Sequence, residues 1–234
     1  SVITTGHFPI ISYKEAMLSF GSDKPDLRNP LRIVDVTDFF QRCTFKPFQG
    51  KTVRAIKVHT DMSKGFHEKL LKFATSIGMG GLGYLEVMED MSYKGPIDKF
   101  IPEDMKPEIK AIAKLEMGDT IFFIADTEDN ATSFAGQLRN ELGAKLDLLE
   151  KNAYRFCYVN DFPMYEYDKD SKKIIFTHNP FSMPQGGLDA LENKNPLDIL
   201  AYQYDIICNG IELSSGAVRN HNLDIMVKAF EIAG

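Results

Sequence analysis

The hydrophobic pattern of the chain changes near residue 151, and this change constrains the fold more than any other feature of the 234 residues. Residues 31–151 alternate short apolar runs, typical of strands, with segments whose apolar residues recur at helical spacing. Residues 152–234 carry mostly strand-like runs. We therefore predict an α+β chain, in which a unit of α/β or α+β type over 31–151 follows a flank and entry loop over 1–30 and precedes a strand-rich part over 152–234.

The expected elements follow from spacing and turn residues. In the alternating part, strands are predicted over 52–58, 84–89 and 120–126, and helices over 63–77, 102–116 and 130–142. In the strand-rich part, the residues 169–172 predict the turn of a β-hairpin. A helix is predicted to begin near Leu197, and another to cover 222–234.

Composition excludes some classes of protein. The net charge of −6 argues against nonspecific binding to polyanions, although a local basic patch stays possible. No apolar run approaches the ~20 residues that cross a bilayer, and the N-terminus has no secretory pattern. The three cysteines are far apart and lack metal-ligand spacing, so we expect free thiols in a reducing cytosol and a cytoplasmic protein.

The glycine-rich run "GMGGLG", residues 78–83, matches the dinucleotide-binding pattern G-x-G-x-x-G. That pattern binds a pyrophosphate only when a strand precedes it and a helix follows. Here a predicted helix ends at the glycines and a predicted strand follows them. We therefore interpret the run as a helix C-cap followed by a tight turn, and we reject nucleotide binding there.

The strand-like segment 204–221 carries charges that a buried strand would carry only if they were paired or bound. Asp205 and Glu212 are seven residues apart and would face opposite sides of a regular strand. A turn or bulge at Asn209-Gly210 would bring them to one side, where paired carboxylates can bind Mg²⁺ together with substrate phosphates. Arg219 offers a bidentate fork for a carboxylate or phosphate. A structural ion pair at a sheet edge explains the same residues, and spacing alone favours it.

His178 ends another strand candidate, just before Pro180. This position predicts a side chain near the mouth of a loop. A structural or simply exposed histidine would occupy the same place.

Four segments taken together carry a resemblance to a known family. They are "YKEAMLSFGSDKPDLRNP", "NDFPMYEYD", "THNPF" and "YDIICNGIELSSGAVRNHN". In this order they closely resemble bacterial-type aspartyl-tRNA synthetase. The resemblance implies that 31–151 is the GAD insertion domain, which the family shares with the B subunit of the tRNA-dependent amidotransferase. It also implies that 1–30 and 152–234 belong to a class II catalytic domain built on an antiparallel sheet.

The resemblance also implies a chemistry. The family activates aspartate with ATP and Mg²⁺ and passes the aspartyl group to tRNA, as a homodimer. Asp205 and Glu212 match the acidic residues that bind the Mg²⁺ associated with ATP. Arg219 matches the arginine that holds the aspartate side-chain carboxylate, and His178 matches a histidine near the amino-acid pocket.

The chain departs from the family pattern at three positions. Asn179 replaces the second histidine of H-H-P-F, and Ser214 and Ser215 replace two glycines. These departures are compatible with a subfamily that charges both tRNA(Asp) and tRNA(Asn). Motif 2, around F-R-D-E, and motif 3, G-x-G-x-D-R, do not occur in the chain. Because those motifs grip ATP, we expect the isolated chain to be an inactive segment, and its own oligomeric state stays open.

Two other functions compete with a synthetase segment. A freestanding GAD-like module would bind tRNA or a partner without catalysis, but it would have no evident need for Asp205, Glu212 and Arg219. A subunit of the amidotransferase would share only 31–151, and the flanking segments disfavour it.

Two sets of cations have structural interpretations. Lys24 and Arg28 are predicted to pair with Asp23 and Asp26 and to shape the entry loop. The second set recurs every four residues on the predicted helix 102–116, where a solvated face is favoured over a stripe for tRNA phosphates. Its members are Lys106, Lys110 and Lys114.

Overall fold

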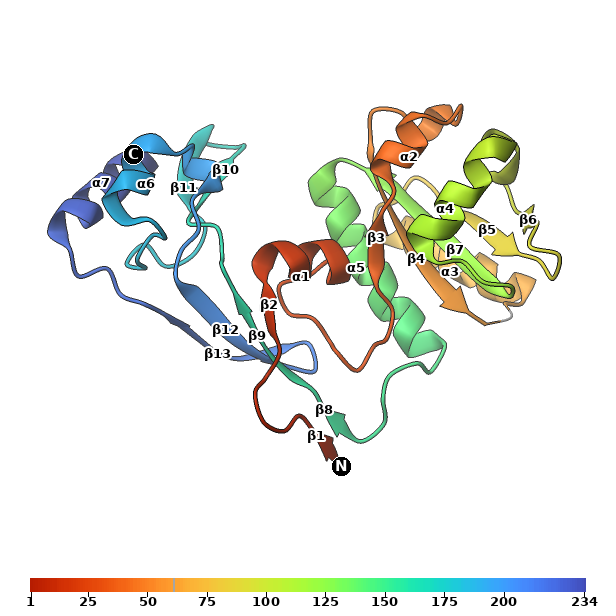
Figure 1. The fold of residues 1–234 in the computed structure, drawn as a ribbon, viewed down its shortest axis with the longest axis horizontal. Coiled ribbons are helices and arrows are strands. Elements are labelled where there is room, and N and C mark those ends of the chain that lie inside the picture. The colour runs from red at the N-terminus through yellow and green to blue at the C-terminus, as the bar shows by residue number, and fades with distance from the viewer. Residues whose placement is uncertain (61) are drawn as a thin grey trace. The chain divides into compact units, whose positions relative to one another are not determined.

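The computed structural model describes residues 1–60 and 62–234, which divide into two compact units. Unit 1 consists of residues 1–16, 23–28 and 152–234, and unit 2 of residues 17–22 and 29–151. The helix α1, Tyr13–Phe20, begins in unit 1 and ends in unit 2 (Figure 1). Among the described residues, no helix is long and apolar enough to cross a membrane.

Unit 2 is built on a five-stranded sheet with the strand order β3-β4-β7-β5-β6. All neighbouring strands pair antiparallel. The strands are β3 Ile33–Asp35, β4 Thr52–His59, β5 Gly83–Val87, β6 Tyr93–Lys94 and β7 Asp119–Asp126. The antiparallel pairing decides between the α/β and α+β arrangements that the sequence left open for this unit, because an α/β unit would have a parallel sheet. The unit is an α+β arrangement.

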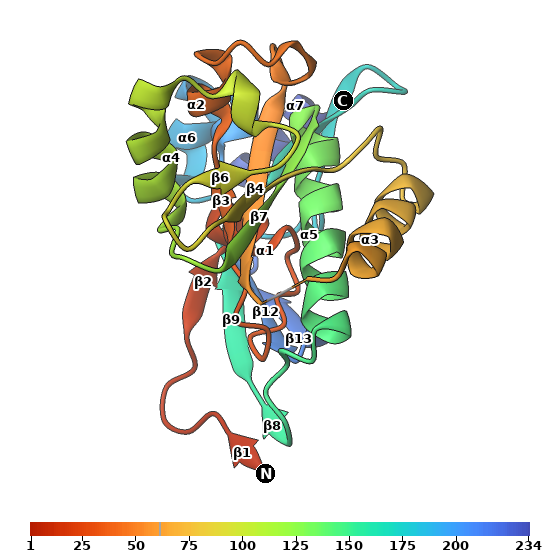
Figure 2. The ribbon, with the colours of Figure 1, turned by 90° about the vertical axis from the view of Figure 1, so that its right-hand side faces the viewer.

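Helices cover both faces of this sheet, as Figure 2 shows. On one face, α3 (Lys64–Ser76) and α5 (Glu128–Lys145) bury apolar side chains against Ile56 and Phe122. On the other, α2 (Thr37–Gln41) and α4 (Lys106–Ala113) pack against Ala55 and Phe123. Successive residues of β4 and β7 thus contribute to two separate cores, which explains why residues 121–125 are continuously apolar.

Short 3₁₀ turns complete unit 2. They are η1 Lys46–Phe48, η2 Asp98–Phe100 and η3 Glu103–Met105. The helix predicted over 102–116 is shorter, since η3 replaces its start and Lys114 adopts a left-handed φ of 51° at its end. The glycine run behaves as interpreted: α3 ends at Ser76, Gly78 has φ +103°, and β5 begins at Gly83.

Unit 1 contains a four-stranded sheet with the order β13-β12-β9-β2. The β2–β9 pair is parallel, and the β9–β12 and β12–β13 pairs are antiparallel. The strands are β2 Ile10–Ser12, β9 Phe156–Asn160, β12 Gln203–Cys208 and β13 Ile211–Ala217. A small core that includes Ala16, Cys157, Val159 and Ile207 lies against this sheet.

The remaining elements of unit 1 lie outside this sheet, and those after residue 160 surround a second core that includes Met164, Tyr165 and Ala229. The hairpin predicted around 169–172 is confirmed by the antiparallel pairing of β10 and β11. The elements are β1 Val2–Ile3, β8 Ala153–Tyr154, β10 Tyr165–Asp168, β11 Lys173–Phe176, α6 Gly187–Asn193 and α7 Leu223–Ala233.

The helix predicted to begin near Leu197 was wrong. Only the 3₁₀ turn η4, Pro196–Asp198, forms there. The chain then extends because Leu200 and Ala201 form isolated bridges with Pro163 and Pro184. These bridges hold the backbone that leads into β12.

Candidate functional site

A two-residue turn joins β12 and β13 and places two carboxylates on one face. Asn209 and Gly210 both have positive φ, 51° and 81°, as a type I′ hairpin turn requires. Both polar atoms of the Asn209 side chain form hydrogen bonds. Its Nδ2 donates to the Ala153 carbonyl at 2.9 Å, and its Oδ1 accepts from the Arg155 amide at 3.0 Å. With this turn, Glu212 lies on the same face of the hairpin as Asp205.

A β-bulge in β13 adds a third charged residue to that face. The register shifts between Ile206 and Ile207, and Leu213 is the extra residue opposite them. Glu212 and Arg219 are seven residues apart and would face opposite sides of a regular extended strand. The extra residue inverts this parity, so both side chains line the same pocket. Sequence reasoning anticipated a turn or bulge only at Asn209-Gly210.

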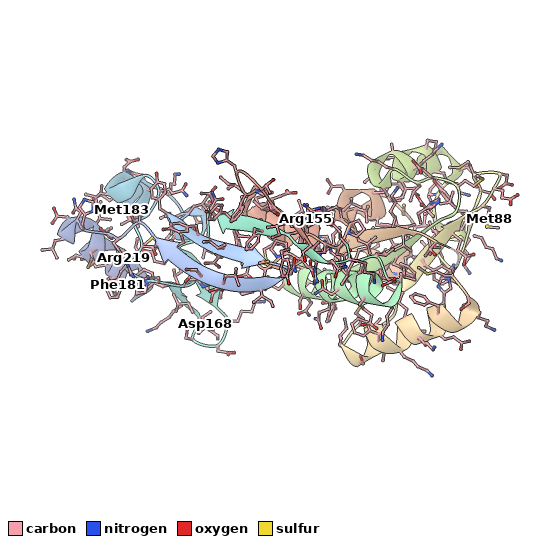
Figure 3. All side chains as sticks on the ribbon, turned by 90° about the horizontal axis from the view of Figure 1, so that it is seen from below. Met88, Arg155, Asp168, Phe181, Met183 and Arg219 are labelled. Carbon is pink, nitrogen blue, oxygen red and sulfur yellow. The ribbon has the colours of Figure 1, made fainter. Side chains whose placement is uncertain are left out.

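The pocket has a volume of about 380 Å³ and is formed entirely by residues of unit 1. It contains all four predicted site residues: His178, Asp205, Glu212 and Arg219. Arg219 lies in the same region as Phe181 and Met183 (Figure 3), because Ser182 and Arg219 form an antiparallel bridge. The structure thus brings the predicted residues together, while their individual roles stay predictions.

Asp205 is the most perturbed acid of this pocket. Its residue is only 9% exposed, and burial together with the neighbouring carboxylates of Glu212 and Asp23 raises the pKa of its carboxyl to about 6. Lys24 opposes this rise. A cation placed between Asp205 and Glu212 would relieve this repulsion.

Lys24 belongs to the pocket, which sequence reasoning missed. The expected loop pairs are confirmed, since Lys24 lies 3.2 Å from Asp23 and Arg28 lies 2.7 Å from Asp26. However, the Lys24 Nζ also lies 3.7 Å from Glu212. Burial lowers the pKa of Lys24, but the surrounding carboxylates outweigh it and leave the pKa raised. Its place within the "GSDKPDLR" segment was the available signal.

His178 and Asn179 lie at the pocket with different functions in the fold. The His178 ring meets the Phe162 ring edge-on, with 5.1 Å between the ring centroids. The Asn179 Oδ1 accepts a hydrogen bond from the Phe181 amide at 2.8 Å, so this side chain shapes a turn. A turn of this kind needs no titratable group at position 179.

Gln203 is a second pocket residue that the sequence did not reveal. It is buried, and its Nε2 donates to the Ser182 Oγ at 2.7 Å and to the Asn179 carbonyl at 3.3 Å. These bonds connect β12 to the segment that carries His178. No motif marked it, because its partners are more than twenty residues away in the sequence.

Gly216 lines the pocket with its backbone, but another contact explains the glycine. A Cβ at this position would lie 2.7 Å from the Tyr204 ring. Tyr204 is the cross-strand partner of Gly216, so the ring packs over a residue that must lack a side chain. The constraint that the structure places on this glycine is therefore aromatic packing.

The pocket residues suit a metal ion whose coordination is completed by a bound ligand. Among the described residues, no group of three or more His, Cys, Asp or Glu side chains could bind a metal ion. Asp205 and Glu212 offer two carboxylates, which is the usual protein share of a Mg²⁺ site completed by phosphates. Burial and then the repulsion from Glu212 raise the pKa of Asp205, and a bound cation would offset both effects.

Several curated proteins that resemble the chain have one name in common. An aspartate–tRNA(Asp/Asn) ligase of Ehrlichia chaffeensis is 56% identical over 97% of this chain, which spans 40% of that protein. Proteins of the same name from Wolbachia pipientis wMel and Zymomonas mobilis are 53% and 52% identical, over 97% and 99% of the chain. The chain therefore spans about 40% of the length of these relatives.

The family match covers nearly every residue. The description "tRNA synthetases class II (D, K and N)" matches residues 2–234, which include both units and the whole pocket. The resemblance drawn from the four sequence segments is thereby confirmed. The chain belongs to the class II tRNA synthetases of the D, K and N group.

Proposed function

We propose that the chain is a segment of an aspartate–tRNA ligase and that the pocket of unit 1 binds aspartate and the metal-bound phosphates of ATP. One observation carries this proposal: two cations, Arg219 and Lys24, line the same pocket as the carboxylates Asp205 and Glu212. An amino acid with an acidic side chain and a metal-bound nucleotide together require both kinds of group. The names of the relatives support the same function.

The cations would bind and orient aspartate. Arg219 presents a planar fork that matches a carboxylate through two hydrogen bonds. Lys24 adds a second positive charge near Glu212. His178, held against Phe162, would border the amino-acid side of the pocket. Together these side chains select a dicarboxylic amino acid over a neutral one.

Asp205 and Glu212 would hold the Mg²⁺ that accompanies ATP. When bound, the metal neutralises phosphate charge and so favours attack at phosphorus. The task of the chain's own residues is to orient the substrates. Held in place, an aspartate α-carboxylate oxygen attacks the α-phosphorus of ATP and pyrophosphate leaves. A ribose hydroxyl at the tRNA end then takes the aspartyl group and AMP leaves.

We assign the parts of the chain to two different domains of the synthetase. We infer that residues 1–30 and 152–234 belong to the class II catalytic domain and that 31–151 is the GAD insertion domain. The antiparallel strands β9, β12 and β13 of unit 1 support the first assignment. We also propose that the whole protein charges both tRNA(Asp) and tRNA(Asn), because the names of its relatives give both tRNAs for those proteins. As a further part of this proposal, the whole protein acts as a homodimer.

A chimera tests this function. The matching segment of the Ehrlichia chaffeensis ligase is replaced by this chain, and aspartate-dependent ATP–pyrophosphate exchange is measured with Mg²⁺. The chimera should catalyse exchange, whereas the isolated chain should not. It should also transfer aspartate to both tRNA(Asp) and tRNA(Asn).

Exchange by the isolated chain would contradict the view that it is an incomplete catalytic segment. A folded chimera without exchange, beside an active parent ligase, would favour a docking module in place of an enzyme segment.

A further inference from the structure

Unit 2 contains a cavity of about 480 Å³ that the proposed function does not use. It lies where α4 ends, and the segment around β3 and the end of β4 complete its walls. Leu31, Val34, Ile112 and Leu148 give it an aliphatic lining. A cavity of this size with an apolar lining and a few polar groups is typical of a small-molecule site.

Among the described residues, the polar side chains that line the cavity are all basic: Arg32, Lys57, His59 and Lys114. This is unexpected in a chain with a net charge of −6. One buried carboxylate lies nearby. Asp119 is 1% exposed, and it lies 3.3 Å from the Lys57 Nζ and 2.8 Å from the His59 Nδ1. Lys57 is therefore already neutralised by Asp119, and it also donates to the Lys114 carbonyl.

Arg32 and Lys114 differ from Lys57 in their ion pairing. Among residues 1–60 and 62–234, no carboxylate forms an ion pair with either side chain. The Arg32 guanidinium lies 4.6 Å from the centre of the Phe20 ring, and its Nη1 donates to the carbonyls of Asn29 and Leu31. These contacts fix its position without compensating its charge. Burial accordingly lowers the pKa of Arg32.

We propose that this cavity binds a small organic anion with an aliphatic body, whose carboxylate or phosphate group is held by Arg32 and Lys114. The guanidinium is fixed in advance, so little side-chain freedom is lost on binding. The aliphatic lining provides apolar contact for the body of the ligand. No Phe, Tyr or Trp lines the cavity, which disfavours a stacked nucleobase. This proposal concerns unit 2 alone and does not rest on the proposed function.

Three probes distinguish the contribution of charge to the binding affinity from that of apolar contact. The ¹⁵N-labelled 234-residue chain is titrated with hexanoate, with 1-hexanol, which has the body without the charge, and with acetate, which has the charge without the body. Hexanoate should shift the amide signals of Ile112 and Leu148 in a saturable way. Its affinity should exceed that of either other probe by about tenfold. Hexyl phosphate, titrated in the same way, distinguishes a phosphate from a carboxylate as the preferred head group.

Variants test the two cations. The double variant Arg32→Gln/Lys114→Gln should weaken hexanoate binding by about tenfold. Lys110→Gln is the matched control, because Lys110 is exposed on the same helix and does not line the cavity. Thermal melting checks that each variant is folded. If the double variant does not fold, the exposed Lys114→Gln alone should still weaken binding, by a smaller factor.

Several results would overturn the proposal. Hexanol that binds as tightly as hexanoate would show an apolar site without charge recognition. Unchanged hexanoate binding by a folded variant would exclude these cations. If neither hexanoate nor hexyl phosphate binds, while unfractionated tRNA shifts the same amides, the surface recognises RNA instead.

Discussion

The two sheets differ in how completely their apolar side chains are covered. In unit 2, the first six residues of β7 are buried, because helices cover both faces of the sheet. In unit 1, β13 is an edge strand whose Ile211 and Leu213 are 64% and 58% exposed. In unit 2, the strand residues form two apolar cores. In unit 1, the less covered hairpin of β12 and β13 carries the charged pocket.

The largest expected loss of stability follows from a substitution in the core of unit 2. Phe123 is 1% exposed, and its ring lies 4.9 Å from that of Phe40, so Phe123→Ala should lower the free energy of unfolding by about 3–5 kcal/mol. Leu213→Ala, on the exposed hairpin, should change it by less than about 0.5 kcal/mol. Urea unfolding followed by circular dichroism measures both. Similar losses for the two variants would contradict the contrast between the sheets.

A second variant tests close packing within unit 2. A Cβ on Gly136 would lie 2.4 Å from the Gly21 carbonyl oxygen, where α5 meets the end of α1. Because backbone must move to admit it, Gly136→Ala should destabilise the chain by about 2–3 kcal/mol. Gly80→Ala is the control, since nothing lies within 4 Å of its Cβ position. A tolerated Gly136→Ala would mean that the two segments are not in contact in solution.

The pocket of unit 1 should make stability depend on pH. Burial and then the carboxylates of Glu212 and Asp23 raise the pKa of Asp205 from 3.8 to about 6, so the folded chain holds this proton more tightly than the unfolded chain. Stability should therefore fall as pH rises from about 4 to about 6, and the full cost should be present above that range. The cost should be about 1–2 kcal/mol after solvent screening in the open pocket.

Asp205→Asn isolates this contribution. Without Mg²⁺ or nucleotide, the difference in unfolding free energy between the variant and the parent chain should shift in favour of the variant as pH rises through the range. Urea unfolding at pH 4, 5, 6 and 7 gives this difference. A constant difference across the four values would mean that Asp205 titrates as an ordinary carboxyl.

The smallest effect is expected at the hairpin turn. Gly210 has φ +81°, a conformation that costs a residue with a Cβ about 1 kcal/mol. Gly210→Ala should destabilise unit 1 by about this amount. Gly81→Ala, in a loop with open space around it, should have little effect. Stabilisation by Gly210→Ala would contradict the type I′ turn.

The sequence predicted local features well and long-range ones poorly. The turn at Asn209-Gly210, the hairpin around 169–172 and the end of α3 before Gly78 follow from residues close in the chain. The bulge at Leu213 carries no local signal, because a leucine fits a regular strand equally well. The contact between Lys24 and Glu212 joins segments that only the folded chain brings together. Strand direction in unit 2 likewise depends on how the connections cross.

The role of the four predicted site residues rests on one arrangement, in which the turn and the bulge place Asp205, Glu212 and Arg219 around one pocket. The most direct test measures aspartate-dependent ATP–pyrophosphate exchange by the chimera with the Ehrlichia chaffeensis ligase. The substitution Arg219→Gln is compared with Lys173→Gln, an exposed cation of β11 outside the pocket.

Arg219→Gln should reduce kcat/KM for aspartate by at least about a hundredfold, because the bound carboxylate would lose its bidentate partner, while Lys173→Gln should leave it unchanged. Equal exchange by the two variants would contradict the assignment of this pocket to aspartate.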